Sequence, residues 1–379
     1  MNDEKIRLFH LFKQNLIQKS NENYLELLDF HIGLHSTDYL TPYFSLWARI
    51  KNFEPEFLFN SLVKNKEALR MNAFRGTLFI IHKNNIALTL ASLNKKREIW
   101  LKDAEKHASK DLNFNQLENE IISLFEKNKQ MKNPEIKKAL ASKYKEIDIT
   151  ILLRTLALNG TIVRTTQKNI TDKIYFYSLM KEWMPEIAQE NIDTNVAVKT
   201  LFEKYLRIFA PVSLDDYCWW LPETKTTALD YLDDFLEKTV KIDYNGTDYY
   251  IHKNDYNNFQ EFNTTDYNEP IVNFLPYEDH FPKAYQKRDY FISDEVKENL
   301  FGVRGLDRGE IRPSIWLNGE VIGRWEYSWI DNKKTRMKIE IIYLNESKIT
   351  KDITKIIEEK RSELELFTNE KLVPLIKRK

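Results

Sequence analysis

The order of expected elements repeats along this chain, and that repetition constrains its fold more than any other feature. Between residues 112 and 180, apolar side chains recur at the spacing of one helix face in three successive segments. Asn159-Gly160 is a typical end for the third segment, and two strand-like runs follow it at 161–165 and 173–177. This region is therefore predicted to fold as three helices and a hairpin.

A less regular copy of this order precedes the region, and another follows it. The first contains predicted helices at 4–30, 43–50, from Glu54 onwards and at 83–93, with a strand at 78–81. The second contains predicted helices at 196–210, from 211 onwards and at 226–236, with strands at 240–244 and 249–252 around Asn245-Gly246. Three helices followed by a strand pair are the order of a winged helix, so we predict three tandem winged-helix units.

The pattern changes near residue 268. Alternating runs predict strands at 311–317, 321–329 and 336–344, then a helix at 350–366 and a basic tail, Lys377-Arg-Lys379. We therefore predict the α+β class, with tandem winged-helix units followed by a C-terminal antiparallel β-barrel-like module. The expected domains are 1–110, 111–185, 186–265 and 266–379.

The composition excludes several classes of protein. The chain has 379 residues, of which 42% are hydrophobic, so a folded protein of two or three domains is expected. With 9 glycines, a glycine-rich phosphate loop is not expected, and the single cysteine, Cys218, rules out an internal disulfide and a cysteine-based zinc site. The start lacks the shape of a signal peptide and no apolar run approaches about 20 residues, so we expect a cytoplasmic protein without a membrane span.

One short stretch places reactive polar side chains between two apolar helices. Residues 33–49 hold His35, Thr37 and Asp38 within four positions, just before Pro42 restarts the chain as a helix. Such a group can hold and deprotonate a water molecule. Other interpretations stay open: His35 can be a hydrogen-bonding residue at a helix end, Asp38 can cap the next helix, and His31 with His35 can be metal ligands on one helical face. No third ligand is evident, so we expect no metal.

Six motifs in order resemble the AlkZ/YcaQ family of winged-helix DNA glycosylases. They are residues 33–49, Phe74-Arg-Gly-Thr-Leu-Phe79 with His82, Tyr217-Cys-Trp-Trp220 after Pro211, Phe274-Leu-Pro-Tyr-Glu-Asp279, Tyr285-Gln-Lys-Arg288, and Arg312 to Trp325. The resemblance implies cleavage of the N-glycosidic bonds of alkylated purines, in some members within interstrand crosslinks. The family's functional motif is Gln-x-Gln or Gln-x-Asp, and its two positions match His35 and Thr37 here, so an imidazole and a hydroxyl replace the family's side chains.

The resemblance gives the polar cluster an expected mechanism. An N7- or N3-alkylated purine already carries positive charge and can leave without a general acid, so the protein must mainly position water and stabilise a cationic sugar. We expect His35 to accept a proton from that water, Thr37 to fix the water, and Asp38 to orient His35 or offset the charge of the sugar. No amine is expected near the cluster, so we predict a monofunctional enzyme without lyase activity and without a cofactor.

Double-stranded DNA containing alkylated purines is the expected partner of a monomeric, nucleoid-associated protein. The basic residues expected to contact DNA are Arg49, Arg75, Arg304, Arg308, Arg312, Lys333, Lys334 and Arg336. Two alternatives remain. The chain can be a non-catalytic winged-helix DNA-binding protein or regulator, or a metal-dependent nuclease that uses His31 and His35.

Overall fold

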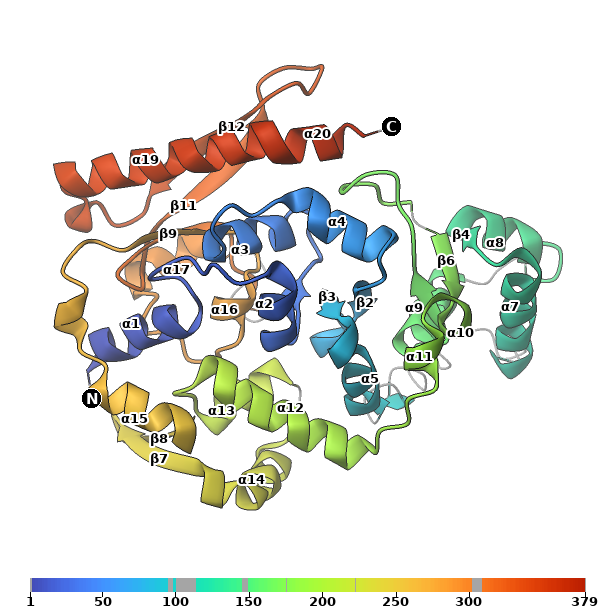
Figure 1. The fold of residues 1–379 in the computed structure, drawn as a ribbon, viewed down its shortest axis with the longest axis horizontal. Helices are drawn as coiled ribbons and strands as arrows, with labels where there is room; N and C mark the ends of the chain where they lie inside the picture. The colour runs from blue at the N-terminus through green and yellow to red at the C-terminus, as the bar shows by residue number, and fades with distance from the viewer. Residues whose placement is uncertain are drawn as a thin grey trace. The chain divides into compact units, whose positions relative to one another are not determined.

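The computed structural model describes residues 2–94, 98–99, 114–144, 149–174, 176–221, 223–301 and 309–378. The chain forms two compact units, of which the first joins the segment up to Pro55 with Phe202–Lys377, and the second contains Glu56–Leu201 and Arg378 (Figure 1). The expected domain 111–185 lies wholly in the second unit, whereas the expected domains 1–110 and 186–265 are each divided between the two. In these described ranges, no helix is both long and apolar enough to cross a membrane.

The first unit contains three N-terminal helices, a group of helices with a hairpin, and a C-terminal sheet with further helices. The N-terminal elements are α1 (Asp3–Lys13), α2 (Tyr24–Phe30), the two-residue strand β1 (Leu34–His35) and α3 (Thr41–Arg49). The middle elements are α12 (Thr194–Phe209, across the unit boundary), α13 (Leu214–Trp220), α14 (Lys225–Asp234), β7 (Thr239–Tyr244), β8 (Thr247–His252) and α15 (Lys253–Glu261). The remaining elements are β9 (Val272–Leu275), α16 (His280–Lys283), α17 (Asp294–Leu300), β10 (Ser314–Leu317), β11 (Glu320–Trp329), β12 (Met337–Tyr343), α19 (Lys351–Phe367), a π-helical turn (Thr368–Leu372) and α20 (Val373–Ile376).

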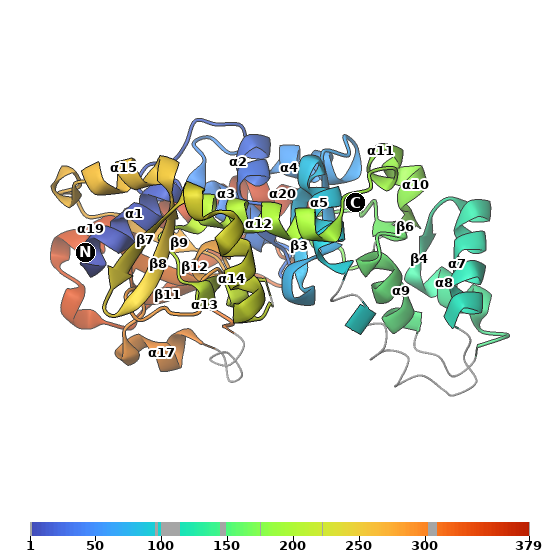
Figure 2. The ribbon, with the colours of Figure 1, turned by 90° about the horizontal axis from the view of Figure 1, so that it is seen from below.

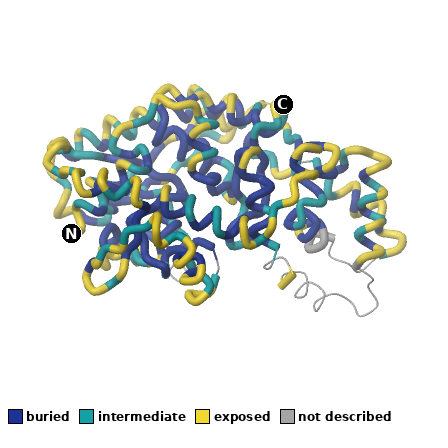
Figure 3. Tube along the Cα trace, turned by 60° about the horizontal axis from the view of Figure 1, so that its bottom comes forward, coloured by how far each residue is buried: buried dark blue, intermediate teal, exposed yellow. Residues whose placement is uncertain are grey.

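The C-terminal sheet has four antiparallel strands in the order β12-β11-β10-β9. Strands β9, β11 and β12 are labelled in Figure 2. Trp316 and Trp325 of this sheet are fully buried, and each indole N–H has an acceptor, Ser314 Oγ at 2.8 Å and Leu275 O at 2.9 Å. Phe44 of α3 packs edge-on against Trp325 with ring centroids 5.3 Å apart. The sheet therefore holds α3, the helix that follows His35, Thr37 and Asp38. Buried residues lie along the interior of the chain trace (Figure 3).

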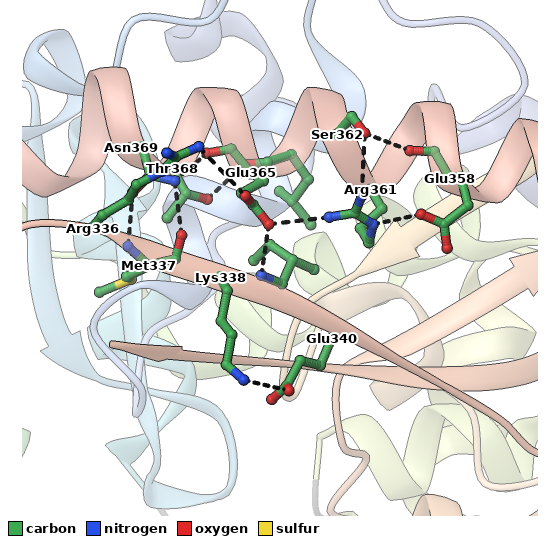
Figure 4. A network of polar contacts seen from close by, with 12 residues as sticks. Arg336, Met337, Lys338, Glu340, Glu358, Arg361, Ser362, Glu365, Thr368 and Asn369 are labelled. Atoms are coloured by element: carbon green, nitrogen blue, oxygen red, sulfur yellow. Dashed lines mark hydrogen bonds and ion pairs between the residues drawn. The ribbon is translucent and has the colours of Figure 1, made fainter. Parts of the chain in front are cut away.

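The described sheet does not close into a barrel, which corrects the expectation of a β-barrel-like module. Its outer strand β12 is instead met by side chains of the C-terminal helical segment (Figure 4). Asn369 accepts from Met337 N and donates to Met337 O, both at 2.8 Å, and Glu365 accepts from Ile339 N at 3.0 Å. Because these bonds satisfy backbone groups that an edge strand leaves open, the sheet can end here without closing on itself.

The second unit contains the three helices and the hairpin that were predicted as a winged helix between residues 112 and 180. Its elements are α4 (Pro55–Val63), β2 (Ala68–Asn72), the 3-10 turn Phe74–Gly76, β3 (Leu78–His82), α5 (Lys83–Ser92), α7 (Phe114–Asn128), β4 (Met131–Lys132), α8 (Asn133–Leu140), α9 (Ile149–Leu158), β5 (Ile162–Arg164), β6 (Phe176–Leu179), α10 (Met180–Trp183) and α11 (Pro185–Ala188). The helices α7, α8 and α9 and the β5–β6 hairpin follow the predicted order. Apolar residues from all five pack into one core, including Phe125, Ile136, Leu153, Ile162 and Leu179.

Candidate functional site

The backbone between α2 and α3 turns the polar cluster towards the interior of the first unit. Ile32 and Gly33 both have positive φ, of 60° and 126°, so the chain changes direction directly after α2 ends. His35 then lies in the short strand β1 and is buried, whereas Thr37 two residues later is exposed. The cluster therefore runs from an enclosed imidazole to a hydroxyl at the surface.

Glu278 and Lys283 complete this cluster from the other end of the chain. His35 Nε2 lies 3.3 Å from Thr37 Oγ1 and 3.4 Å from Glu278 Oε2, and the same carboxylate oxygen accepts from Lys283 Nζ. Glu278 itself has a φ of 55°. Its backbone N–H donates to Ile311 O at 2.9 Å, and its Oε1 accepts from Ile311 N at 3.3 Å. The carboxylate is thus fixed on three sides, beside a ring 243 positions earlier in the sequence.

The imidazole of His35 is neutral and enclosed. Its side chain has 0% exposure, and burial lowers the pKa of His35 well below its ordinary value, with the nearby Lys283 ammonium lowering it further. This placement corrects the expectation that His35 itself takes the proton of an attacking water, because a ring without exposed surface cannot contact a water at the surface of the unit. His35 can act on such a water through Thr37.

Asp38 has a structural role in this arrangement. Its Oδ1 accepts from Leu40 N at 2.9 Å and from Thr41 N at 3.2 Å, which are among the amides at the start of α3 that have no partner within the helix. The carboxylate is half-buried and adjoins the positive end of the helix dipole. The capping interpretation is therefore the one that its contacts support, and no described bond joins Asp38 to His35.

Arg49 lies in the interior, which corrects the expectation that it contacts DNA. Its guanidinium has 0% exposure and donates to both oxygens of Asp279, at 2.7 and 3.0 Å. Ser45 Oγ donates to the same carboxylate at 2.7 Å. These bonds join α3 to the segment that carries Glu278, so they hold the two halves of the cluster in register.

The histidine pair considered as metal ligands does not share a helix. His31 follows the last residue of α2, and His35 lies in a strand. The ring of His31 instead packs against that of His280 with centroids 4.7 Å apart. Burial lowers the pKa of both His31 and His280 well below the ordinary value. Within the described ranges, no three side chains of His, Cys, Asp or Glu are grouped as metal ligands.

The other residues expected to contact DNA have varied surroundings. Arg75 is half-buried in the 3-10 turn of the second unit with a φ of 55°. Arg304 and Arg308 lie outside the described residues. Arg312 lies beside the end of α17, with Nη1 3.5 Å from Asn299 O.

The turn between β11 and β12 carries the remaining basic residues. Lys333, Lys334 and Arg336 are all exposed there. Arg336 lies 3.8 Å from Glu365 Oε1, which leaves 65% of its side chain exposed (Figure 4). These three side chains stay predicted DNA contacts in the first unit.

Sequence reasoning did not single out Glu278 and Lys283 as site residues, although Glu278 lies inside a motif quoted for the family resemblance. A signal was present. Glu278 and Asp279 are adjacent acids separated by Pro276-Tyr277 from the apolar run Phe274-Leu275, where a buried strand would end. Lys283 follows Asp279 by four positions, so a basic side chain close to the two acids could be predicted from the sequence, but the approach of Glu278 and Lys283 to His35 could not.

Two comparisons relate this chain to known proteins. The family model described as DNA glycosylase AlkZ-like matches residues 31–341, a range that includes the whole cluster. The solved structure of the Streptomyces sahachiroi DNA glycosylase AlkZ is similar to this one with a TM-score of 0.76 and 13% sequence identity, over 98% of this chain and 97% of that chain. No curated protein matches. The structural likeness shows a shared mixed α+β fold, and the family match extends over most of the sequence.

Proposed function

Because the chain belongs to the AlkZ-like DNA glycosylase family, we propose that it hydrolyses the N-glycosidic bond of N7- or N3-alkylated purines in double-stranded DNA, including bulky or crosslinked adducts. The observation that carries this proposal is the exposed Thr37 hydroxyl, backed by the buried ring of His35 and the Glu278–Lys283 ion pair. The cluster offers an attacking water a fixed polar anchor without a strong base. Hydrolysis of an already cationic purine needs little more, because its leaving group departs without protonation.

The tautomer of His35 decides what Thr37 can do. A neutral imidazole carries one N–H, and a carboxylate beside Nε2 favours the proton on that nitrogen. Nε2–H then donates towards Glu278 and Thr37, which leaves the Thr37 hydroxyl with an oxygen lone pair and a proton to direct at water. In this scheme Thr37 is the residue that touches the water, and His35 and Glu278 position it.

Lys283 bears on the expected lack of lyase activity. It brings an amine close to the cluster, contrary to the expectation that none is near. A lyase needs a neutral amine to attack the sugar, whereas an ammonium held by the Glu278 carboxylate has no lone pair to offer. We therefore keep the proposal of a monofunctional enzyme that leaves an abasic site.

The test is an excision assay on duplexes that carry N7-methylguanine, N3-methyladenine or a nitrogen-mustard crosslink. Release of free base, with the strand cut only after alkali treatment, is the expected result. Borohydride added during the reaction should trap no covalent protein–DNA adduct, and a trapped adduct would contradict the monofunctional mechanism.

The enclosure of His35 favours a second candidate, a non-catalytic winged-helix DNA-binding protein. In that case the exchange of the family's glutamine for a buried imidazole marks lost chemistry. Binding to duplex DNA without base release from any of the three substrates would select this candidate.

A further inference from the structure

A second carboxylate lies near the cluster of His35, Thr37 and Glu278, in the segment before β10. Glu310 is next to Ile311, whose backbone N–H donates to Glu278 Oε1 at 3.3 Å and whose carbonyl oxygen accepts from Glu278 N at 2.9 Å. Glu278 Oε2 in turn lies 3.4 Å from His35 Nε2. All of these residues belong to the first unit, and Glu310 is partly exposed. The backbone of Glu310 is therefore fixed beside the cluster, and its side chain is available to a ligand.

Tyr277 holds the Glu310 carboxylate in place. Its hydroxyl donates to Glu310 Oε1, and its carbonyl oxygen accepts from Thr41 Oγ1 at 2.7 Å, which ties Tyr277 to the first residue of α3. Tyr277 also directly precedes Glu278 in the chain. The pair of Tyr277 and Glu310 is thus joined to the cluster twice, through the backbone at Glu278 and through α3.

The charges that act on the tyrosine hydroxyls beside the cluster are negative. Burial raises the pKa of Tyr277 above its ordinary value, the hydrogen bond to Glu310 and the charge of Glu310 raise it further, and so does the Asp38 carboxylate. Burial also raises the pKa of Tyr327 of β11, and Asp38 adds to that effect. Because Asp38 directly follows the exposed Thr37, both hydroxyls lie within electrostatic reach of the residue next to Thr37.

Of these carboxylates, Glu310 keeps its charge available to a ligand. The Asp38 carboxylate accepts from amides at the positive end of α3, and Glu278 forms an ion pair with Lys283. Within the described ranges Glu310 forms no ion pair, and the group that its carboxylate contacts is the uncharged hydroxyl of Tyr277. A carboxylate that is held in place without being neutralised suits a cationic ligand.

We propose that Glu310, positioned by Tyr277, recognises the positive charge of the alkylated purine and so makes the site select cationic over neutral bases. The proposal rests on the function proposed above, because it takes an alkylated purine as the ligand. A purine alkylated at N7 or N3 carries a delocalised positive charge that the undamaged base lacks. The Glu310 carboxylate stabilises that charge, and the ring of Tyr277 adds a cation–π contact. This preference concerns binding of the base, whereas the Thr37 hydroxyl holds the water.

The test measures, by fluorescence anisotropy, binding of the full-length protein to two duplexes that resist hydrolysis. One carries N7-methylguanine on a 2′-fluorinated sugar, and the other carries 7-methyl-7-deazaguanine on the same sugar, which has the same shape without the charge. The wild type should prefer the cationic duplex by about 5-fold, the upper end for a partly exposed charge pair. Glu310→Gln should remove this preference, and Tyr277→Phe should reduce it because the carboxylate is no longer held.

Two further variants separate charge from structure. Glu310→Asp keeps the charge and should retain part of the preference. The matched control, Glu298→Gln, removes an equal charge from an exposed position on α17 and should bind both duplexes like the wild type. Circular dichroism should show that all variants are folded. Equal binding of the two duplexes by the wild type, or an unchanged preference in Glu310→Gln, would overturn the proposal.

The two proposals fail separately. A wild type that prefers the cationic duplex but releases no base from N7-methylguanine DNA loses the proposed activity and keeps the recognition of charge. An active wild type whose Glu310→Gln variant shows the same preference loses only the role of Glu310.

Discussion

Lowering the pH from 7 to 5 should destabilise this protein through its buried histidines. His10, His31, His35 and His280 are each at least 95% buried, and burial lowers the pKa of all four, that of His10 to about 3. In the unfolded chain these groups titrate near pH 6.5. Between that pH and the folded pKa, the unfolded state binds more protons than the folded state, so stability falls as the pH falls.

The size of the effect follows from the same linkage. For His10, which stays neutral in the folded state at pH 5, the loss between pH 7 and pH 5 is about 2 kcal/mol. His31, His35 and His280 act in the same direction, so the total lies between about 2 kcal/mol and about 8 kcal/mol, the latter if all four stay neutral.

Urea unfolding at the two pH values measures this loss, and the variant His10→Asn isolates one contribution. The variant should lose about 2 kcal/mol less than the wild type between pH 7 and pH 5. Because the two proteins have the same carboxylates, the contribution of those groups to the pH-dependence of stability is equal in both and drops out of the difference. A free energy of unfolding that is equal at the two pH values in the wild type, or an equal loss in both proteins, would refute the assignment of neutral buried imidazoles.

Three further predictions concern the cluster. Between pH 6 and pH 8, kcat/KM for base excision should not change with the ionisation of a group near pH 6.5, because burial lowers the pKa of His35 well below that value. A decrease in kcat/KM as the pH falls through 6.5 would instead show that His35 is a general base. Arg49→Ala should lower the free energy of unfolding by about 3–5 kcal/mol, because it leaves the Asp279 carboxylate buried without its partner, whereas Lys241→Ala at an exposed ion pair should cost less than about 1 kcal/mol. Asp38→Ala should cost about 1 kcal/mol as a lost helix cap, and Asp38→Asn should restore both stability and activity; loss of excision in the Asn variant would show that the charge of Asp38 is needed for chemistry.

The winged helix of the second unit was predictable from the sequence because its signals are local. Apolar spacing within 112–180 marks each helix, and Asn159-Gly160 ends the last one, with Gly160 at a φ of 68°. The family resemblance, drawn from six short motifs, is confirmed by the match over residues 31–341. The spacing of apolar residues and the order of short motifs are both visible in one sequence, so they can be recognised without a structure.

The site was harder to predict because its parts meet over long separations. The Arg49–Asp279 ion pair joins residues 230 positions apart, and nothing near Arg49 in the sequence shows that its charge is buried. Strand β9 was missed because all four of its residues are buried, which removes the alternation of a half-exposed strand. The closed barrel was wrongly expected because strand patterns do not show that Asn369 and Glu365 would occupy the sheet edge.

The most direct test of the central claim compares Thr37→Val with Thr37→Ser in single-turnover excision of N7-methylguanine. Valine keeps the shape of threonine without the hydroxyl, and serine keeps the hydroxyl that His35 contacts. The account predicts that the valine variant is slowed by about 100-fold, the scale of a misplaced reactant, while binding to the lesion duplex is unchanged and the serine variant stays within a fewfold of the wild type. Equal rates for the wild type and the valine variant would show that the attacking water is held elsewhere.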